Sequence, residues 1–351
     1  MTSKREKKAD SVGKELAKGE ILPPNAPRDQ FMALRPKIIG GSDVGVITGD
    51  NPYKKQLQLK LEKREEVEPD DPNYLMRIGS HMESFIRDDF RREMDEWTFG
   101  PEMGTIRHRE IGYFAASVDD WAIDEQGNAI IIDYKNVSSY GAKKWKGGGL
   151  PTHYYAQGQW YMMILKSWVP QHFDACYFRA VVDNRSTELR VITLDEEWIR
   201  KATVAANAFW SAMLTDDMEY FLQQIDGDEA TNAALLAAYP GDPDEKAVDL
   251  IGSDSEEKIN QWCMAYERAK TMQGEIDNNV RRLKSSIQAM MRNATKANTN
   301  DFKISWPVIR GRERFSQSLL KKAHPSMDLS PYMTRASKYR GGLRITPSKG
   351  E

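Results

Sequence analysis

The sequence has few cysteines and no long apolar run, and both shortages exclude whole classes of protein. Its 351 residues include only Cys176 and Cys263, which lie far apart, so it predicts no disulfide framework, zinc ribbon or iron–sulfur cluster. No stretch approaches the roughly 20 uncharged apolar residues that a membrane-spanning helix needs. The N-terminal stretch is charged and lacks the apolar segment of a secretory signal, so we expect a cytoplasmic protein.

The chain as a whole has almost no excess of one charge sign, since its formal net charge is only −2. The charges are unevenly distributed, however. Residues 271–351 carry 16 Lys and Arg against 6 Asp and Glu, a net of +10, so the rest of the chain carries −12. A basic tail on an acidic body suits contact with the phosphates of a nucleic acid. An ordinary solvated surface explains the same distribution equally well.

Shifts in composition divide the chain into four parts. Residues 1–30 are charged and end in a proline-rich stretch, which predicts a disordered arm. Residues 31–223 alternate helical and strand-like patterns, which predicts an α/β core with a central mixed β-sheet flanked by helices. Residues 224–255 are acidic and loop-like and predict a linker. Residues 256–351 predict a helical, basic C-terminal unit.

The C-terminal unit is predicted to begin with a long amphipathic helix over residues 256–294. Its apolar residues recur at spacings of three and four, close to heptads. Such a stripe serves either self-association or packing against the chain's own core, and the pattern leaves both open. The basic residues that follow, among them Arg310, Arg312 and Lys338, are expected to line a DNA path or to dock a protein partner.

The strongest chemical signal is a strand that ends in charged residues. The apolar, β-branched run of residues 129–135 predicts a strand buried in a sheet, and it ends in Asp133, Tyr134 and Lys135. Because side chains alternate across a strand, Asp133 and Lys135 project to one face and Tyr134 to the other. Charged residues are rare inside a sheet unless they are paired or bound to a metal ion.

A second carboxylate is predicted to lie beside this pair. Asp119 is in the preceding strand, and a hairpin with its turn near Gly127 would bring it close to Asp133. Two carboxylates and an ammonium group suit Mg²⁺- or Mn²⁺-dependent phosphodiester hydrolysis, with the lysine orienting a water or taking its proton. A surface hairpin with a salt bridge fits the spacing too. Strand alternation also leaves open whether Asp119 or Asp120 is the metal ligand.

Three neighbouring segments add candidate residues. Glu83 lies on a helix predicted over residues 74–96, although an exposed helical glutamate is an equally ordinary explanation. Gln157 lies on an aromatic-rich helix predicted over residues 152–167, where a buried amide needs a partner. The glycine-rich loop after the strand predicts DNA contacts through three lysines, unless it is simply solvated: Lys143, Lys144 and Lys146.

Five pieces of sequence, taken in order, resemble the lambda-exonuclease-like, or YqaJ-type, viral recombinases of the PD-(D/E)XK nuclease superfamily. The pieces are residues 34–43, residues 51–53, residues 79–83, Asp119 together with residues 133–135, and residues 155–161. The resemblance covers roughly residues 31–215. Val118 departs from the family's usual proline and Asp120 from a common glycine, while Asp133 replaces the commoner glutamate.

The resemblance implies a role for each matched residue. Asp119, Asp133 and Glu83 match the family's metal ligands, which implies two Mg²⁺ or Mn²⁺ ions. Lys135 matches the catalytic lysine, and Gln157 matches a glutamine of the same site. The family register favours Asp119 over its neighbour as the ligand.

The resemblance also implies a substrate and partners. Arg35 and Ser42 match residues that hold the 5′-terminal phosphate of DNA. The implied activity is 5′→3′ degradation of one strand of linear double-stranded DNA, in a phage or prophage recombination system with a single-strand annealing protein. Members that degrade DNA processively form rings, so a homo-oligomer is expected. A structure-specific or restriction-type endonuclease and an inactive DNA-binding scaffold remain the alternatives.

Overall fold

The computed structural model describes residues 3–66, 74–225, 227–239, 241, 248–309 and 316–330. Contacts divide the chain into two units, Met1–Pro240 and Gly241–Glu351. Within the described ranges, no helix is both long enough and apolar enough to cross a membrane.

A five-stranded mixed sheet forms the centre of the first unit, in the order β2-β5-β6-β7-β8. The pair β6 and β7 is parallel, whereas the other neighbours are antiparallel. The strands are β2 (Thr98–Phe99), β5 (Asp120–Ile123), β6 (Ala129–Val137), β7 (Ala175–Val182) and β8 (Ser186–Thr193). The predicted central mixed sheet is confirmed.

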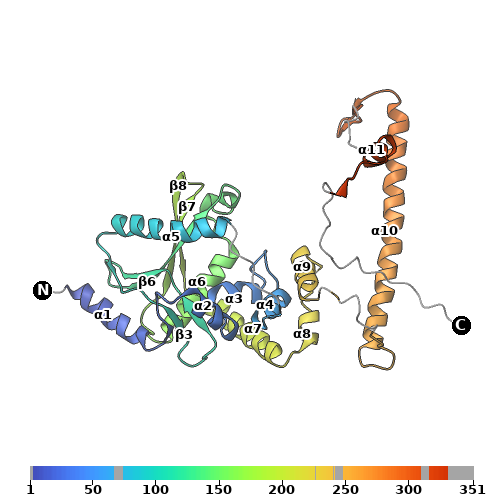
Figure 1. Ribbon diagram of the computed structural model, residues 1–351. Helices are drawn as coiled ribbons and strands as arrows, with labels where there is room; N and C mark the ends of the chain where they lie inside the picture. Colours follow the sequence, from blue (N-terminus) through green and yellow to red (C-terminus); the bar gives the residue numbers. More distant parts are fainter. Residues whose placement is uncertain are drawn as a thin grey trace. The chain divides into compact units, whose positions relative to one another are not determined.

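Helices cover both faces of this sheet (Figure 1). On one face, α5 (Tyr74–Glu93) packs its buried Ile86 and Phe90 against the β6 side chains Ile130, Ile132 and Tyr134. On the other face, α6 (Thr152–Lys166) belongs to the larger core, which contains Ile131 and Val137 of β6. Because β6 is buried on both faces, its apolar run does not alternate with polar residues until Asp133. The predicted flanking helices are confirmed.

Further helices pack on the α6 side of the sheet. They are α3 (Gly41–Ile47), α4 (Gln56–Lys63), α7 (Glu196–Leu214), α8 (Met218–Leu222) and α9 (Glu229–Ala238). Helices α7 and α8 are separate, because Asp216 has φ +53° and Asp217 caps a new helix through the Tyr220 amide. Helix α9 lies in the stretch expected to be a linker, and its buried Ala234 joins the main core.

The disordered arm expected over residues 1–30 is also wrong. Residues 4–17 form α1 (Lys4–Ala17), which Ser3 and Glu6 start with a reciprocal capping box. Its buried residues Ala9, Val12 and Leu16 lie three and four positions apart and pack into the main core. The many charges occupy the other faces of the helix and hide this short apolar stripe in the composition. Two short elements follow, β1 (Glu20–Leu22) and α2 (Arg28–Leu34).

A second, three-stranded sheet has the order β1-β3-β4. It contains β3 (Thr105–Arg107) and β4 (Ala115–Ser117). A turn separates β3 from β4, and in it His108 Nδ1 accepts hydrogen bonds from the amides of Glu110 and Ile111, both at 3.1 Å.

The second unit consists of α10 (Glu256–Met291), the hairpin β9 (Lys296–Asn298) and β10 (Lys303–Ser305), and α11 (Gln317–Ala323). The long helix expected over residues 256–294 is confirmed and ends three residues earlier. Arg310, Arg312 and Lys338, which were expected to contact DNA or a protein partner, lie outside the described residues.

The packing of α1 makes a testable prediction. Leu16→Ala removes a fully buried side chain, so we expect the free energy of unfolding to fall by about 2–5 kcal/mol. The matched control is Lys14→Ala on the exposed side of the same helix, which should change it by less than about 0.5 kcal/mol. Urea unfolding of both variants measures the difference, and equal stabilities would show that α1 does not pack on the core.

Candidate active site

Asp119 comes to lie beside Asp133 through the register of the β5–β6 hairpin. The ladder pairs Asp120 with Ile132, so Asp119, one position earlier, stands opposite Asp133. The Oδ2 atom of Asp119 accepts a hydrogen bond of 2.8 Å from the amide of Tyr134. The predicted convergence of the two carboxylates is therefore present.

Asp133 is fully buried in the middle of β6, which continues to Val137. It forms an ion pair with Lys135 through Oδ1, but neither of its oxygens accepts a well-formed hydrogen bond from the described residues. Burial raises the pKa of Asp133 to about 7, and the nearby Asp119 adds to the increase while Lys135 opposes it. A buried carboxylate with unsatisfied oxygens is the kind of group that a cation satisfies.

Lys135 projects to the same side as Asp133, as strand alternation predicts. Burial disfavours its charged form, but the carboxylates of Asp133 and Asp119 outweigh burial, so the pKa of Lys135 is raised. The ammonium also lies 4.9 Å from the centre of the Tyr154 ring. In the metal-free protein the lysine therefore holds its proton, and it can donate hydrogen bonds to a phosphate or a water molecule.

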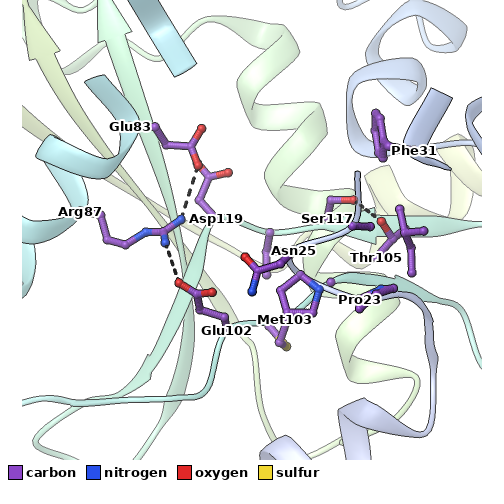
Figure 2. Close-up of a pocket in the computed structure, with 15 residues that line it drawn as sticks. Pro23, Asn25, Phe31, Glu83, Arg87, Glu102, Met103, Thr105, Ser117 and Asp119 are labelled. Atoms are coloured by element: carbon purple, nitrogen blue, oxygen red, sulfur yellow. Dashed lines mark hydrogen bonds and ion pairs between the residues drawn. The ribbon is translucent and has the colours of Figure 1, made fainter. Parts of the chain in front are cut away.

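Glu83 approaches the same carboxylates from α5. Figure 2 shows the carboxyl groups of Glu83 and Asp119 pointing toward one another across one end of a cavity. Burial raises the pKa of Glu83, and the charge of Asp119 raises it further. Like charges this close favour a bound cation between them.

Arg87 was not identified from the sequence, although it lies one helical turn after Glu83. It bridges Glu83 at 3.5 Å and Glu102 at 3.2 Å, so it holds the Glu83 side chain beside the cavity (Figure 2). Its Nε atom is buried without a hydrogen-bond partner among the described residues. The four-residue spacing of an acidic and a basic residue on one helix was the signal for this pair.

The structure separates the roles of the neighbouring acids Asp119 and Asp120. Asp120 accepts hydrogen bonds from Arg91 at 2.8 and 2.9 Å, from the Tyr134 hydroxyl at 2.9 Å and from the Trp121 amide at 2.9 Å. Its carboxylate is thus occupied by protein donors. Asp119 accepts a hydrogen bond through Oδ2, and its carboxyl group points toward Glu83 (Figure 2), so the geometry favours Asp119 as the metal ligand.

Two cavities adjoin in this region. The first, of about 390 Å³, is lined by Glu83, Arg87 and Asp119 together with the segment of residues 22–26. The second is lined by the residues matched to 5′-phosphate binding and by Gln157: Arg35, Ser42, Asp43, Gln157 and Tyr161. Both cavities share Phe31, Thr105 and Ser117, so one continuous wall leads from the acids to the second cavity.

The second cavity depends on close packing between α3 and α6. A Cβ atom on Gly41 would lie 2.5 Å from the Tyr161 ring and 3.1 Å from Gln157, so only glycine allows this approach. The Gln157 amide donates a hydrogen bond to the Tyr161 hydroxyl. Burial raises the pKa of Tyr161, and the charges of Asp133 and Asp119 raise it further, which places this tyrosine between the two groups of residues.

A buried ion pair supports the turn that carries Arg35. Lys63 of α4 contacts Asp43 at 2.9 Å and donates hydrogen bonds to the carbonyls of Arg35 at 3.0 Å and Ile38 at 2.5 Å. It thereby fixes the short helix η1 (Arg35–Lys37) against α3. The guanidinium of Arg35 is partly exposed and reaches Glu62 only at 3.8 Å.

The glycine-rich loop that carries Lys143, Lys144 and Lys146 has regular structure that the sequence does not indicate. It contains the short helices η2 (Gly141–Lys144) and η3 (Lys146–Gly148), and Trp145 between them is buried beneath Arg190 rather than exposed to a nucleic acid. Lys143 is exposed, and Lys144 donates a hydrogen bond of 3.0 Å to the hydroxyl of Tyr53. The side chain of Lys146 lies outside the described residues.

The acidic residues fit a hard divalent cation by their chemistry. Within the described part of the chain, no three acidic, histidine or cysteine side chains are drawn together as closely as a complete metal site would hold them. Asp119 and Asp133 nevertheless offer oxygen ligands, and the buried oxygens of Asp133 accept no well-formed hydrogen bond from the described residues. An all-oxygen set of this kind suits Mg²⁺ or Mn²⁺ better than softer metals.

These environments predict opposite effects on stability. In buffer with chelator, Asp120→Asn should lower the free energy of unfolding by about 2–3 kcal/mol, because it breaks a largely buried ion pair with Arg91. Asp119→Asn should leave stability unchanged or raise it, because it relieves burial of charge among like charges. Chemical unfolding of the two variants checks this, and a large loss for Asp119→Asn alone would reverse the assignment.

The pH dependence follows from the raised pKa of Asp133. The folded state binds this proton more tightly than the unfolded state, whose value is 3.8, so wild-type stability should fall as pH rises from about 4 to about 7. Asp133→Asn lacks this contribution. The stability of Asp133→Asn minus that of the wild type should therefore increase between about pH 4 and pH 7 and stay constant above pH 7. A difference that decreases as pH rises contradicts the burial argument.

Comparison with known proteins finds a family model and a relative that are similar to this chain. Residues 30–166 match the model of the YqaJ-like viral recombinase domain. The chain is 25% identical over 299 residues to the uncharacterized protein YqaJ of Bacillus subtilis (strain 168), covering 84% of this chain and 89% of that one.

Solved structures of exonucleases are also similar to it. The alkaline exonuclease of Laribacter hongkongensis in complex with dAMP has a TM-score of 0.43 and 19% identity, over 56% of this chain and 97% of that one. A phage-related exonuclease from Haemophilus somnus 129PT has a TM-score of 0.38 and 14% identity, over 52% and 96%. On the strength of the family match, the stretch of residues 30–166 is a YqaJ-like viral recombinase domain, as its motifs indicated.

Proposed function

We propose that this protein is a divalent-metal-dependent deoxyribonuclease that degrades one strand of linear double-stranded DNA from its 5′ end. The observation that carries the proposal is the buried carboxylate of Asp133, whose only close cation among the described residues is Lys135, beside Asp119. Burying these charges costs stability, and the ion pair with Lys135 offsets that cost only in part, since the second oxygen of Asp133 has no partner among the described residues. Two carboxylates and a lysine at a cavity are what hydrolysis of a phosphodiester requires.

Each residue has a distinct task in this proposal. Asp119 and Asp133 hold the cation, with Glu83 as the third carboxylate, and two ions are expected. The bound cations supply positive charge against the phosphate and acidify a water molecule. Lys135, which holds its proton, donates a hydrogen bond to the phosphate or orients the attacking water. Arg87 is a positioning residue, because it keeps Glu83 directed at Asp119.

The second cavity supports the 5′→3′ polarity. Its guanidinium, hydroxyl and amide groups from Arg35, Ser42 and Gln157 suit a phosphate monoester at a strand end. The wall that the two cavities share can carry the terminal nucleotides from this cavity to the acids. If water attacks phosphorus and the P–O3′ bond breaks, the shortened strand again begins with a 5′-phosphate, so the same cavity can engage it after each cleavage.

Further groups are proposed to contact the DNA outside the cavities. Tyr53 is 63% exposed, and its ring lies 5.0 Å from the ammonium of Lys144 and edge-on to His153. An exposed aromatic ring beside a cation suits stacking with a base and attraction to the phosphate backbone. The exposed strand left by digestion is proposed to pass to a single-strand annealing protein in recombination, as the family description supports.

Two other functions use the same residues. An endonuclease has the same catalytic acids but does not need a free strand end, and a scaffold protein needs only the DNA contacts. The second cavity favours the exonuclease, because its residues suit a terminal phosphate rather than a continuous backbone. Linear and closed circular duplex DNA distinguish the three functions.

The first prediction from this proposal concerns the metal and the acids. Linear duplex should be digested with Mg²⁺ or Mn²⁺ but not in excess chelator, whereas Ca²⁺ should support binding without turnover. Asp119→Ala and Asp133→Ala should each lower the rate by roughly 1,000-fold or more, since the cation contributes several kcal/mol to the transition state. Asp120→Asn is the matched acid control and should keep its activity once folded.

Each possible result of this assay has one meaning. Digestion of linear but not closed circular DNA supports the exonuclease, and cutting of closed circles supports the endonuclease. Binding without digestion under every metal supports the scaffold. Full activity in chelator, or near wild-type rates for Asp119→Ala, contradicts the proposed chemistry itself.

The second prediction separates end recognition from catalysis. The wild type should prefer 5′-phosphorylated over 5′-hydroxyl ends by roughly 10- to 100-fold, the range for a charge-assisted hydrogen bond. Arg35→Ala should bring this ratio close to one, while Lys37→Ala, an exposed residue of the same turn, should leave it unchanged. Competition between labelled ends measures the ratio. An unaltered ratio in Arg35→Ala means that the phosphate is held elsewhere.

A further inference from the structure

Helix α10 of the second unit presents a long apolar stripe that no described part of the chain covers. Of its 36 residues only Met291 is buried. Seven large apolar side chains of the stripe are between 38% and 86% exposed: Trp262, Tyr266, Ile276, Val280, Leu283, Ile287 and Met290. Helices draw most of their stability from packing an apolar face, and exposed patches of this size mark interaction sites.

The stripe follows an unbroken heptad repeat through five heptads. Each heptad has two core positions, and with Ile259 as the start of the first heptad, the first core positions (position a) are Ile259, Tyr266, Gln273, Val280 and Ile287. The second core positions are Trp262, Ala269, Ile276, Leu283 and Met290. A sustained repeat of this kind gives a straight seam along a left-handed supercoil, which is the geometry of a coiled coil rather than of a helix lying on a globular surface.

We propose that α10 pairs with α10 of a second copy of this chain as a parallel, in-register coiled coil. The composition of the two core positions supports this partner and orientation. Three of the five first core positions, Ile259, Val280 and Ile287, are β-branched, as two-stranded parallel coiled coils prefer, and one of the five second core positions is Leu283.

Gln273 selects the parallel orientation. It is the only polar residue at the ten core positions. In an antiparallel pair, first core positions face second core positions, so Gln273 would always meet an apolar side chain and lose its hydrogen bonds. In a parallel, in-register pair it faces Gln273 of the other copy, and two amides can bond to each other. One polar pair in an apolar seam also fixes the register.

The residues beside the seam carry no charge conflict with a second copy. In a parallel pair, the residue just before a first core position of one helix (position g) faces a residue of the other helix five positions further along (position e). The resulting pairs are Lys258 with Cys263, Ala265 with Lys270, Met272 with Asp277, Asn279 with Lys284, and Ser286 with Met291. None joins two like charges.

The stripe is large enough for a stable pair. The exposed parts of its large apolar side chains amount to roughly 500 Å² on one helix, taking about 60–120 Å² for an aliphatic and 150–250 Å² for an aromatic side chain. Two helices then bury on the order of 1,000 Å², the size at which specific interfaces begin. This pairing joins two copies without using any residue of the proposed active site.

The first test is sedimentation of the full chain. The wild type should have about twice the 40.1 kDa mass of one chain. Leu283→Lys places a charge in the seam and should give monomers at concentrations where the wild type is dimeric. Met264→Lys adds the same charge at an outward position that is 54% exposed, and it should stay dimeric. Near-ultraviolet circular dichroism of each variant checks that the first unit remains folded.

The second test identifies orientation and register. Gln273→Cys in a Cys263→Ser background should form an interchain disulfide under mild oxidation, because facing core positions in register lie within reach of one. Thr271→Cys, at an outward position, should not, and Cys176 is buried and does not interfere. A monomeric wild type, a dimer that Leu283→Lys does not dissociate, or a Gln273→Cys variant that fails to cross-link would each overturn the proposal.

Discussion

The burial of a charged pair within β6 is the constraint on which the rest of the first unit depends. Asp133 is fully buried and raised in pKa, and Lys135 is its only close cation among the described residues. Removing these charges from water is unfavourable, so the strand must be held by strong packing elsewhere. Helices α5 and α6 supply that packing, because they bury the apolar part of β6 on both faces.

The same constraint explains why two adjacent acids behave differently. Arg91, Tyr134 and a backbone amide saturate Asp120, and this network joins α5 to both strands of the β5–β6 hairpin. A shift of one residue in the β5–β6 register would place Asp120 opposite Asp133 in place of Asp119. Because its hydrogen bonds fix Asp120 in position, they also keep Asp119 opposite Asp133. Stability and chemistry are thus divided between neighbours, Asp120 serving the fold and Asp119 the proposed cation site.

The sequence predicted this part of the molecule well because its signals are local. Strand alternation placed Asp133 and Lys135 together, and the hairpin length placed Asp119 opposite them. Contacts between distant segments were missed, since nothing in the sequence pairs Lys63 with Asp43 or Arg91 with Asp120. Composition misled at residues 1–30, where three buried residues among many charges suffice to dock a helix. The roles of Glu83, Gln157, Arg35 and Ser42 rest on the resemblance and stay proposals.

The central claim is that Asp119 and Asp133, and not Asp120, hold a divalent cation. Anomalous diffraction from crystals of the full chain soaked in Mn²⁺ tests it most directly, because it locates the ion without requiring turnover. The account predicts a peak at the carboxylates of Asp119 and Asp133 that disappears in Asp133→Asn. A peak at Asp120, or no peak in this region at saturating Mn²⁺, would contradict the account.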